Sequence, residues 1–314
     1  MRVPGRLRLG VAGVALLTAS CLVLPAVLPD LPDHDPVGAS LLPPGTRVTA
    51  VTLTNGTTVT SPDVEVTRSA VVVGGEHRTR TILLDEVAGT RSFRFWLGSD
   101  RFGRDVLRRV LRGGRVSLWI ATLSLLLSIV IGGSVGTAAA SSGGVLDGVL
   151  MRFVDALLAF PVLFLMIFAS TVLRPGTLLL IALLGCTSWM GFARLVRGQV
   201  LSLRSRLFVL AAQTSGSRRA RIVRLHYAPN LMGPLAPDAA LRMGDLVIAE
   251  ATLSFLGLGV PPTIPTWGSM VAEGQRAMLD GWWLTVVPGV AIAALVISLA
   301  LIGDGLAQRG EPSA

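Results

Sequence analysis

Long uncharged stretches recur along the chain of 314 residues, and their spacing predicts its architecture. A helix needs about 20 mainly apolar residues to cross the hydrocarbon core of a bilayer. Stretches of this length predict six membrane-spanning helices, at residues 9–29, 116–146, 153–173, 175–193, 231–256 and 281–303. Because lipid offers the backbone no hydrogen-bond partners, we expect these spans to pack as an all-α bundle.

The first predicted span also has the pattern of a signal peptide, with a basic start, an apolar middle and small residues near Cys21. Cleavage would remove the span from the mature protein. We favour an uncleaved helix, because the other five spans pair naturally with it.

The region between the first two spans has the pattern of strands. Residues 48–53 and 57–60 flank Asn55-Gly56, which is a strong signal for a hairpin turn. Runs rich in Val, Thr and Ile at 64–73 and 78–84 predict further strands. We therefore expect a small β-rich insert at residues 30–96. A solvated cap on the bundle is favoured over a direct docking surface.

Composition supports a membrane protein. Only 15% of the residues are charged and the mean hydropathy is +0.66, whereas a soluble domain carries about 25% charged residues. The 28 basic residues, all arginine, outnumber 19 acidic ones, and the sequence pI is near 11.3. That pI suggests nucleic acid, but the arginines lack interleaved aromatic residues and lie mostly in predicted loops. Nucleic-acid binding is therefore not expected.

The positions of the arginines predict the orientation of the chain. Residues 194–230, the arginine-rich segment, contain eight Arg and no acid, and the N-terminus contains three Arg before the first span. Short loops rich in Arg stay in the cytoplasm. Six spans then place both termini and the arginine-rich segment in the cytoplasm and the insert outside. The arginines that adjoin the second span, from Arg101 to Arg115, oppose this rule.

Cysteine and histidine offer little chemistry. Cys21 and Cys186 are far apart in apolar runs, so neither a disulfide framework nor a metal site is expected. An intramembrane enzyme would need a nucleophile beside a base. The three histidines, His34, His77 and His226, all lie outside the predicted spans, which disfavours such an enzyme.

Charge inside the fifth predicted span is unusual, because ionisable groups are costly there and often functional. Asp238, Arg242 and Asp245 share one helix face at spacings of four and three, so we expect them to neutralise one another. Glu250 has no obvious partner at helical spacing.

Several motifs resemble one family of transport proteins. The string Leu97-Gly98-Ser99-Asp100-Arg101-Phe102-Gly103-Arg104-Asp105 precedes the second span, where Asp105 and Arg109 can pair on a helix face. The most specific run extends from Glu250 to Pro262 and is followed by Trp267-Gly268-Ser269-Met270, Glu273-Gly274 and Trp282-Trp283. With Met151 to Pro161, these strings resemble the permeases of dipeptide and oligopeptide ABC importers.

The arginine-rich segment carries the more general signature of ABC importer permeases: Ala-Ala, a Gly, then a Pro about thirteen residues later. In that family the element forms two short helices, broken here at Gly216, that dock on the ATP-hydrolysing subunit. The resemblance assigns contacts with the ATPase to Leu210, Ala211, Ala212, Gly216, Ile222, His226, Pro229 and Asn230, and basic contacts to Arg218, Arg219, Arg221 and Arg224. Leu210 departs from the family, which has Glu there.

The resemblance implies a six-transmembrane-helix type I ABC importer permease bundle with a small β-rich extracytoplasmic insert. The implied regions are 1–29 (N-terminus and first span), 30–112 (insert and pre-helix segment), 113–306 (permease core, with the coupling loop at 194–230) and 307–314 (tail).

It further implies a multi-pass protein of the cell membrane that moves di- or oligopeptides. The implied partners are a homologous second permease subunit, two ABC ATPase subunits and an extracytoplasmic substrate-binding protein, in a lipid bilayer. ATP and Mg would be bound by the ATPases, since the chain has no Lys and so no Gly-x-x-x-x-Gly-Lys loop. The same motifs occur in nickel and glutathione importers. An ion-coupled secondary transporter is less favoured. In this reading Asp238, Arg242, Asp245 and Glu250 are candidates for the pathway or a subunit interface.

Overall fold

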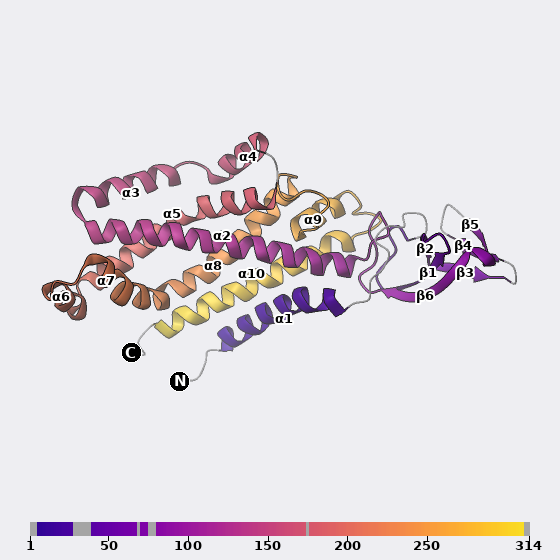
Figure 1. Cartoon of the computed structure of the whole chain (residues 1–314), viewed down its shortest axis with the longest axis horizontal. Helices are drawn as coiled ribbons and strands as arrows, with labels where there is room; N and C mark the ends of the chain where they lie inside the picture. Colours follow the sequence, from indigo (N-terminus) through magenta and orange to yellow (C-terminus); the bar gives the residue numbers. More distant parts are fainter. Residues whose placement is uncertain (1–4, 28–38, 68–69, 75–79, 174–175, 311–314) are drawn as a thin grey trace. The chain divides into compact units, whose positions relative to one another are not determined.

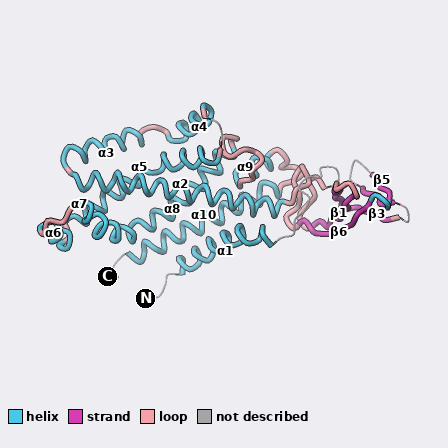
Figure 2. The backbone as a smooth tube through the Cα atoms, viewed as in Figure 1, coloured by secondary structure: helices cyan, strands magenta, loops and turns pink. Residues whose placement is uncertain are grey.

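A computed structural model describes residues 5–27, 39–67, 70–74, 80–173 and 176–310. The chain divides into two compact units. The first contains residues 1–17, 117–261 and 292–314, and the second contains residues 18–116 and 262–291. Helices build the first unit, whereas the described strands all belong to the second (Figure 2). The helices are α1 Gly5–Val27, α2 Val106–Ser142, α3 Gly144–Leu158, α4 Val162–Val172, α5 Thr177–Arg204, α6 Leu207–Thr214, α7 Arg219–Ile222, α8 Ala228–Phe255, α9 Trp267–Gln275 and α10 Trp283–Gly310.

Four of the described helices, α1, α2, α5 and α10, are long and apolar enough to cross a membrane. They coincide with the first, second, fourth and sixth predicted spans. The fifth predicted span is α8, with 28 residues and four ionisable side chains. The prediction of a single third helix is wrong, because the chain breaks between α3 and α4. Pro161 lies at this break, and proline supplies no backbone N–H to continue a helix.

Glycines let helices of the first unit approach closely. A Cβ atom at Gly132 or Gly136 of α2 would collide with the backbone of α5, at the carbonyls of Trp189 and Ala193. Small residues at such crossings allow two backbones to pack tightly in a membrane. Gly10 of α1 lies against the backbone of α10 in the same way, at the carbonyl of Ser298. Figure 1 shows α2, α5 and α8 as long helices that run alongside one another.

Two ion pairs attach α3 to α5. Arg197 donates to both carboxylate oxygens of Asp147, at 2.6 and 2.7 Å. These hydrogen bonds lower the pKa of the Asp147 carboxyl. Arg194 meets Asp155 at 2.6 Å in a more exposed pair. Three of the eight arginines of the arginine-rich segment, Arg194, Arg197 and Arg204, therefore belong to α5, which extends beyond the predicted end of the fourth span.

The insert consists of two three-stranded antiparallel sheets, in the orders β2-β1-β6 and β3-β4-β5. The strands are β1 Thr46–Leu53, β2 Thr58–Ser61, β3 Asp63–Val66, β4 Ala70–Gly74, β5 Arg80–Leu83 and β6 Val87–Phe95. The predicted hairpin is confirmed: β1 pairs with β2, and Gly56 has a φ of +83°. The sequence pattern did not predict β6, although it pairs with β1 along its whole length.

Apolar side chains from both sheets form the core of the insert. Val51 and Leu53 of β1 pack with Val71, Val73 and Ile82 of the second sheet. The other face of β1 carries Val48, which packs with Ala39 and Phe95. Alternation along β1 therefore gives both faces of the first sheet buried apolar contacts.

Candidate functional site

The arginine-rich segment turns at Gly216, immediately after α6. The N–H of Ser217 bonds to the carbonyl of Ala212, and the N–H of Gly216 bonds to that of Gln213, each at 3.0 Å. This pair of bonds is a Schellman motif, which requires a left-handed residue after the helix. Gly216 supplies it with a φ of +73°, and no heavy atom lies within 4 Å of a Cβ placed there. Within this chain, Gly216 is therefore needed for its backbone angle.

The second half of the segment differs from the prediction. The two-helix prediction is correct for α6, but α7 is only the first turn of a longer helix. A π-helical turn at Val223–Tyr227 joins α7 directly to α8. Pro229 lies in the first turn of α8, where the missing N–H is tolerated. The side chain of Asn230 donates to the carbonyl of His226 at 2.7 Å. The segment is therefore rigidly continuous with α8.

Buried side chains attach the segment to the bundle. Val209 of α6, Ile222 of α7 and Tyr227 of the π turn are at most 5% exposed. They belong to one apolar cluster with Ala140 of α2 and Phe192, Val196 and Val200 of α5. The rings of Phe208 and His226 also lie 5.9 Å apart. A displacement of α6 or α7 would thus press directly on α2 and α5.

The opposite side of the segment is exposed. Leu210, in the position that the family fills with Glu, is 43% exposed and Leu207 is 84% exposed. The side chains of Arg218, Arg219, Arg221 and Arg224 are exposed too, and none forms an ion pair with any residue that the structure describes. Of the other predicted contact residues, Ala211, Gly216, Pro229 and Asn230 are exposed, Ala212 and His226 are partly buried, and Ile222 is buried.

The charged residues of α8 separate into two groups. Arg242 donates to Asp238 and, at 3.3 Å, to the carbonyl of Ser188 on α5. Its guanidinium also lies 5.7 Å from the centre of the Phe192 ring. Asp245 does not join them, because its side chain is exposed and makes no ion pair within the described part of the chain. The structure therefore brings together two of the three residues predicted to neutralise one another.

Glu250 is fully buried in α8. The hydroxyl of Ser254, one helical turn later, donates to its carboxylate at 2.7 Å. The prediction that Glu250 lacks a partner at helical spacing is wrong, because the Ser254 hydroxyl lies four residues later on the same helix face. Gly259 lies against Ser254, since a Cβ there would collide with the Ser254 hydroxyl. The Glu-to-Gly run that is specific to the family is thus packed around this carboxylate.

A cavity of about 780 Å³ lies in the first unit between α2, α5 and α8. Its walls are mainly apolar, with hydroxyl groups of α2 such as Ser134 and Thr137. Val223 of the π turn and Ala228 of α8 also line it. The arginine-rich segment therefore forms part of the wall of this cavity.

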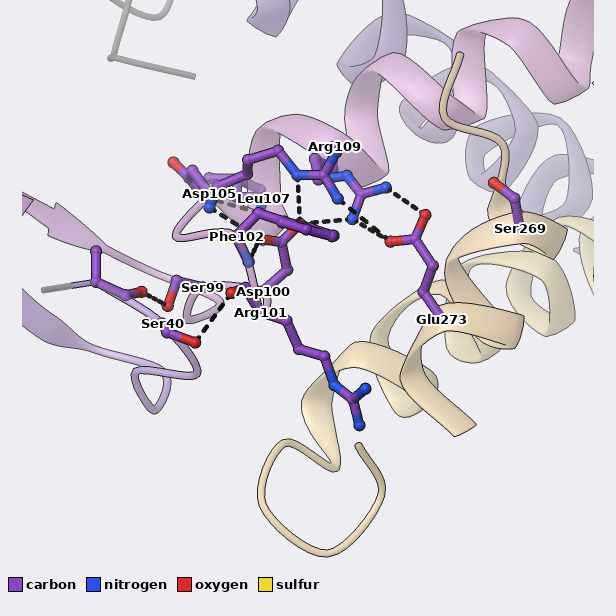
Figure 3. A network of polar contacts seen from close by, with 12 residues as sticks. Ser40, Ser99, Asp100, Arg101, Phe102, Asp105, Leu107, Arg109, Ser269 and Glu273 are labelled. Atoms are coloured by element: carbon purple, nitrogen blue, oxygen red, sulfur yellow. Dashed lines mark hydrogen bonds and ion pairs between the residues drawn. The ribbon is translucent and has the colours of Figure 1, made fainter. Parts of the chain in front are cut away.

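The second unit contains a buried ionic network that sequence reasoning missed (Figure 3). Arg109 of α2 donates to Asp100 at 2.7 Å and to both carboxylate oxygens of Glu273 at 2.6 and 3.0 Å. Arg104 bonds to Asp100 at 2.6 Å and reaches Glu273 at 3.4 Å. The side chains of Asp100 and Arg109 are 3% and 10% exposed. Two cations and two anions thus balance each other and tie α9 to the start of α2.

The predicted pair of Asp105 and Arg109 does not form. Asp105 instead meets Arg108 at 3.5 Å and accepts the N–H of Leu107 at 2.9 Å. Burial raises the pKa of the Asp105 carboxyl despite these contacts. Arg109 is drawn away because Glu273, 164 residues later, supplies a bidentate acceptor. The clue available in sequence was that the strings containing Asp100 and Glu273 both belong to the resembled motifs.

Two tryptophans of those motifs also hold the second unit together. The indole N–H of Trp267 donates to the carbonyl of Val110 at 2.9 Å, and that of Trp283 donates to the carbonyl of Ser99 at 3.1 Å. Both side chains are at most 4% exposed. Among the described residues, no group of three His, Cys, Asp or Glu side chains could hold a metal ion.

Comparisons with known proteins agree with these features. Residues 117–313 match the family of binding-protein-dependent transport system inner membrane components. A peptide transport system permease protein of Brucella suis is 41% identical over 215 residues, which cover 68% of this chain and 72% of that protein. The dipeptide transport system permease protein of Bacillus subtilis is 36% identical over 218 residues, covering 69% of this chain and 68% of that protein.

The fold has a counterpart among solved structures. An inward-facing conformation of the MetNI methionine ABC transporter superposes with a TM-score of 0.55 at 18% identity. The match covers 64% of this chain and 95% of the other. The predicted fold class, a helical ABC importer permease bundle with a small β-rich insert, is therefore confirmed. The matched length and identity show that the chain belongs to the family of binding-protein-dependent transport system inner membrane components.

Proposed function

We propose that this permease subunit carries di- or oligopeptides into the cell, together with a homologous second permease, two ABC ATPase subunits that bind ATP and Mg, and an external substrate-binding protein. The names of the relatives support a peptide cargo. Uptake of labelled tripeptides, nickel and glutathione by proteoliposomes holding the whole complex distinguishes the cargoes. Uptake of nickel or glutathione, without uptake of the labelled tripeptides, would contradict the proposal of a peptide cargo.

We propose that both termini and the arginine-rich segment are cytoplasmic and that the β-rich insert is external. The eight arginines without an acid in residues 194–230 support this orientation. A single helix, α2, follows the insert, so the insert and Ser142 would lie on opposite sides of the membrane. Cysteine labelling from outside tests the orientation: a Cys at Thr57 should react and one at Arg219 should not.

The observation that carries the coupling proposal is the two-sided character of the arginine-rich segment. Its exposed side presents arginines that form no ion pair with the described residues, and its buried side joins the apolar cluster with α2 and α5. The acidic groove of a partner could bind the arginines of α7. Movement of that partner would displace Val209, Ile222 and Tyr227, which pack against α2 and α5. ATP-driven closure of the ATPases would thus switch the bundle from inward-open to outward-open.

Leu210 changes how the ATPase would be held. In place of a carboxylate it offers an apolar side chain beside Leu207, so this end of the contact would depend on burial of apolar surface and little on salt. Replacing Gly216 by Trp should detach the ATPase during co-purification, whereas Gly198→Trp on α5, where a Cβ also meets nothing within 4 Å, should not. ATP-independent uptake by the purified chain under an ion gradient would contradict the proposal.

We propose that Glu250 acts at the transport pathway or at the contact with the second permease. A fully buried carboxylate is costly in a membrane helix even when it accepts a hydrogen bond from Ser254, and such residues are often functional. Glu250→Gln keeps an acceptor for Ser254 and nearly the same volume. We expect it to lower uptake at least tenfold while the complex still assembles. Unchanged uptake would show that the charge is not required.

A further inference from the structure

One face of the β1–β6 pair is exposed at the end that carries Arg47 and Arg94. Arg47 and Thr49 of β1 lie directly opposite Arg94 and Ser92 of β6, and the hydroxyls of Thr49 and Ser92 are 3.0 Å apart. Two residues further along the same face, Val51 is fully buried under the second sheet. The second sheet therefore covers one end of this face and leaves the arginine end exposed.

The two arginines of this face form a like-charged pair without compensation. Residues directly opposite on antiparallel strands have Cβ atoms about 5 Å apart, and like charges there destabilise the sheet. Neither Arg47 nor Arg94 forms an ion pair with any residue that the structure describes. By contrast, Arg104 and Arg109 of the same unit each bind two carboxylates.

An exposed aromatic ring, that of Trp96, lies beside Arg94 of this pair. The guanidinium of Arg94 lies 5.2 Å from the ring centre of Trp96, whose side chain is 61% exposed. Tryptophan and arginine are the residues that dominate binding energy at protein interfaces. The face thus combines two cations, two hydroxyl groups and an exposed indole.

We propose that Arg47, Thr49, Ser92, Arg94 and Trp96, the Arg47–Arg94 patch, bind an acidic surface of the substrate-binding protein. The proposal rests on the proposed function, which places the insert outside the cell and supplies such a partner. Guanidinium groups bind carboxylates in a two-pronged geometry. Two acidic residues one helical turn apart, with Cβ atoms about 5–6 Å from each other, would match the spacing of Arg47 and Arg94.

A protein partner fits this patch better than a lipid surface does. Recognition of anionic lipids uses clusters of about four to eight basic residues, whereas this face has two. The alternation of the strands also directs Arg91, the other exposed arginine of β6, to the opposite face, since it pairs with Ala50. The charge is therefore localised, as in a contact with one or two carboxylates.

The test measures binding of the transporter's labelled substrate-binding protein to the whole transporter in nanodiscs. We expect Arg47→Ala/Arg94→Ala to weaken its affinity at least tenfold and to reduce the salt dependence of binding. The matched control Arg91→Ala should change affinity less than twofold. Trp96→Ala leaves both arginines in place and should weaken binding several-fold. It tests the same patch independently if the double variant misfolds.

Other outcomes would overturn the proposal. Equal affinity for wild type and the double variant would exclude the patch as the docking surface. If the double variant instead loses binding to vesicles of anionic phospholipid while keeping the binding protein, the patch recognises lipid. Failure of the wild-type complex to bind any substrate-binding protein would contradict the proposed function itself, and the patch proposal with it.

Discussion

Arginine has opposite surroundings in two regions of this chain. At the start of α2, Arg104 and Arg109 are largely buried and each meets both Asp100 and Glu273. In the arginine-rich segment, the arginines of residues 218–224 are exposed and have no anionic partner in the described chain. The first region satisfies its charge internally. The second presents its charge outward, as a surface that another subunit could neutralise.

Charge at the start of α2 therefore stabilises the subunit, whereas charge at residues 218–224 is available to a partner. Removing one arginine of the first region leaves two carboxylates to share a single cation in a largely buried site. An exposed arginine without a partner costs little when it is removed. The two regions should therefore respond to mutation in opposite ways, with loss of stability in the first and loss of assembly in the second.

The largest effect is expected for Arg109→Met. Removing this cation leaves only Arg104 to balance Asp100, which is almost fully buried, and Glu273, so we expect a loss near the lower end of the range for a broken buried pair, about 3 kcal/mol. Thermal unfolding of the purified protein in detergent should show a large fall in Tm. Arg115→Met, an exposed arginine on the same helix, is the control and should change stability by about 0.5 kcal/mol or less. A Tm for Arg109→Met equal to that of the control would show that the buried arginine does not stabilise the subunit more than an exposed one.

A smaller effect is expected for Gly216→Val. The left-handed backbone at this position is strained for a branched side chain, at about 1–3 kcal/mol. Because the strain lies in the exposed turn, we expect loss of ATPase binding together with a modest fall in Tm. Gly198→Ala in α5, where a Cβ meets nothing within 4 Å, should leave both unchanged. ATPase binding that survives Gly216→Val would show that the turn is not needed.

The smallest effect is expected for Asp147→Asn, because its ion pair with Arg197 is only partly buried. Pairs of this kind contribute about 1 kcal/mol or less. The folded protein lowers the pKa of Asp147, so the contribution is present above the ordinary pKa and lost as the pH falls through the lowered value. Asp155→Asn, in a more exposed pair, should have less effect in the same unfolding assay. A larger loss for Asp155→Asn would contradict this ordering by burial.

The sequence predicted the features that depend on local pattern. Four spans, the hairpin at Asn55-Gly56 and the turn at Gly216 follow from runs of apolar residues and from glycine chemistry. Strand β6 was missed because its side chains are mostly exposed, so its pattern lacks apolar alternation. The break before α4 was missed because apolar residues continue on both sides of Pro161.

Contacts between distant residues could not be predicted in this way. Arg109 has Asp105 within one helical turn, and local spacing therefore favoured that pair. The structure pairs it with Glu273 because α9 brings a second carboxylate to a site where burial makes charge compensation necessary. Helical spacing likewise suggested Asp245 as a partner of Arg242, whereas the guanidinium instead bonds to Asp238 and to α5.

The exposed arginines of residues 218–224, which form no ion pair within the described chain, should face a separate ATPase. The most direct test places a photo-crosslinking amino acid at Arg219, and for comparison at Arg91, in membranes where ATP-driven uptake is active. We predict that position 219 forms an adduct with an ATP-hydrolysing subunit and that position 91 does not. If uptake is active but position 219 crosslinks to no such subunit, the account is contradicted.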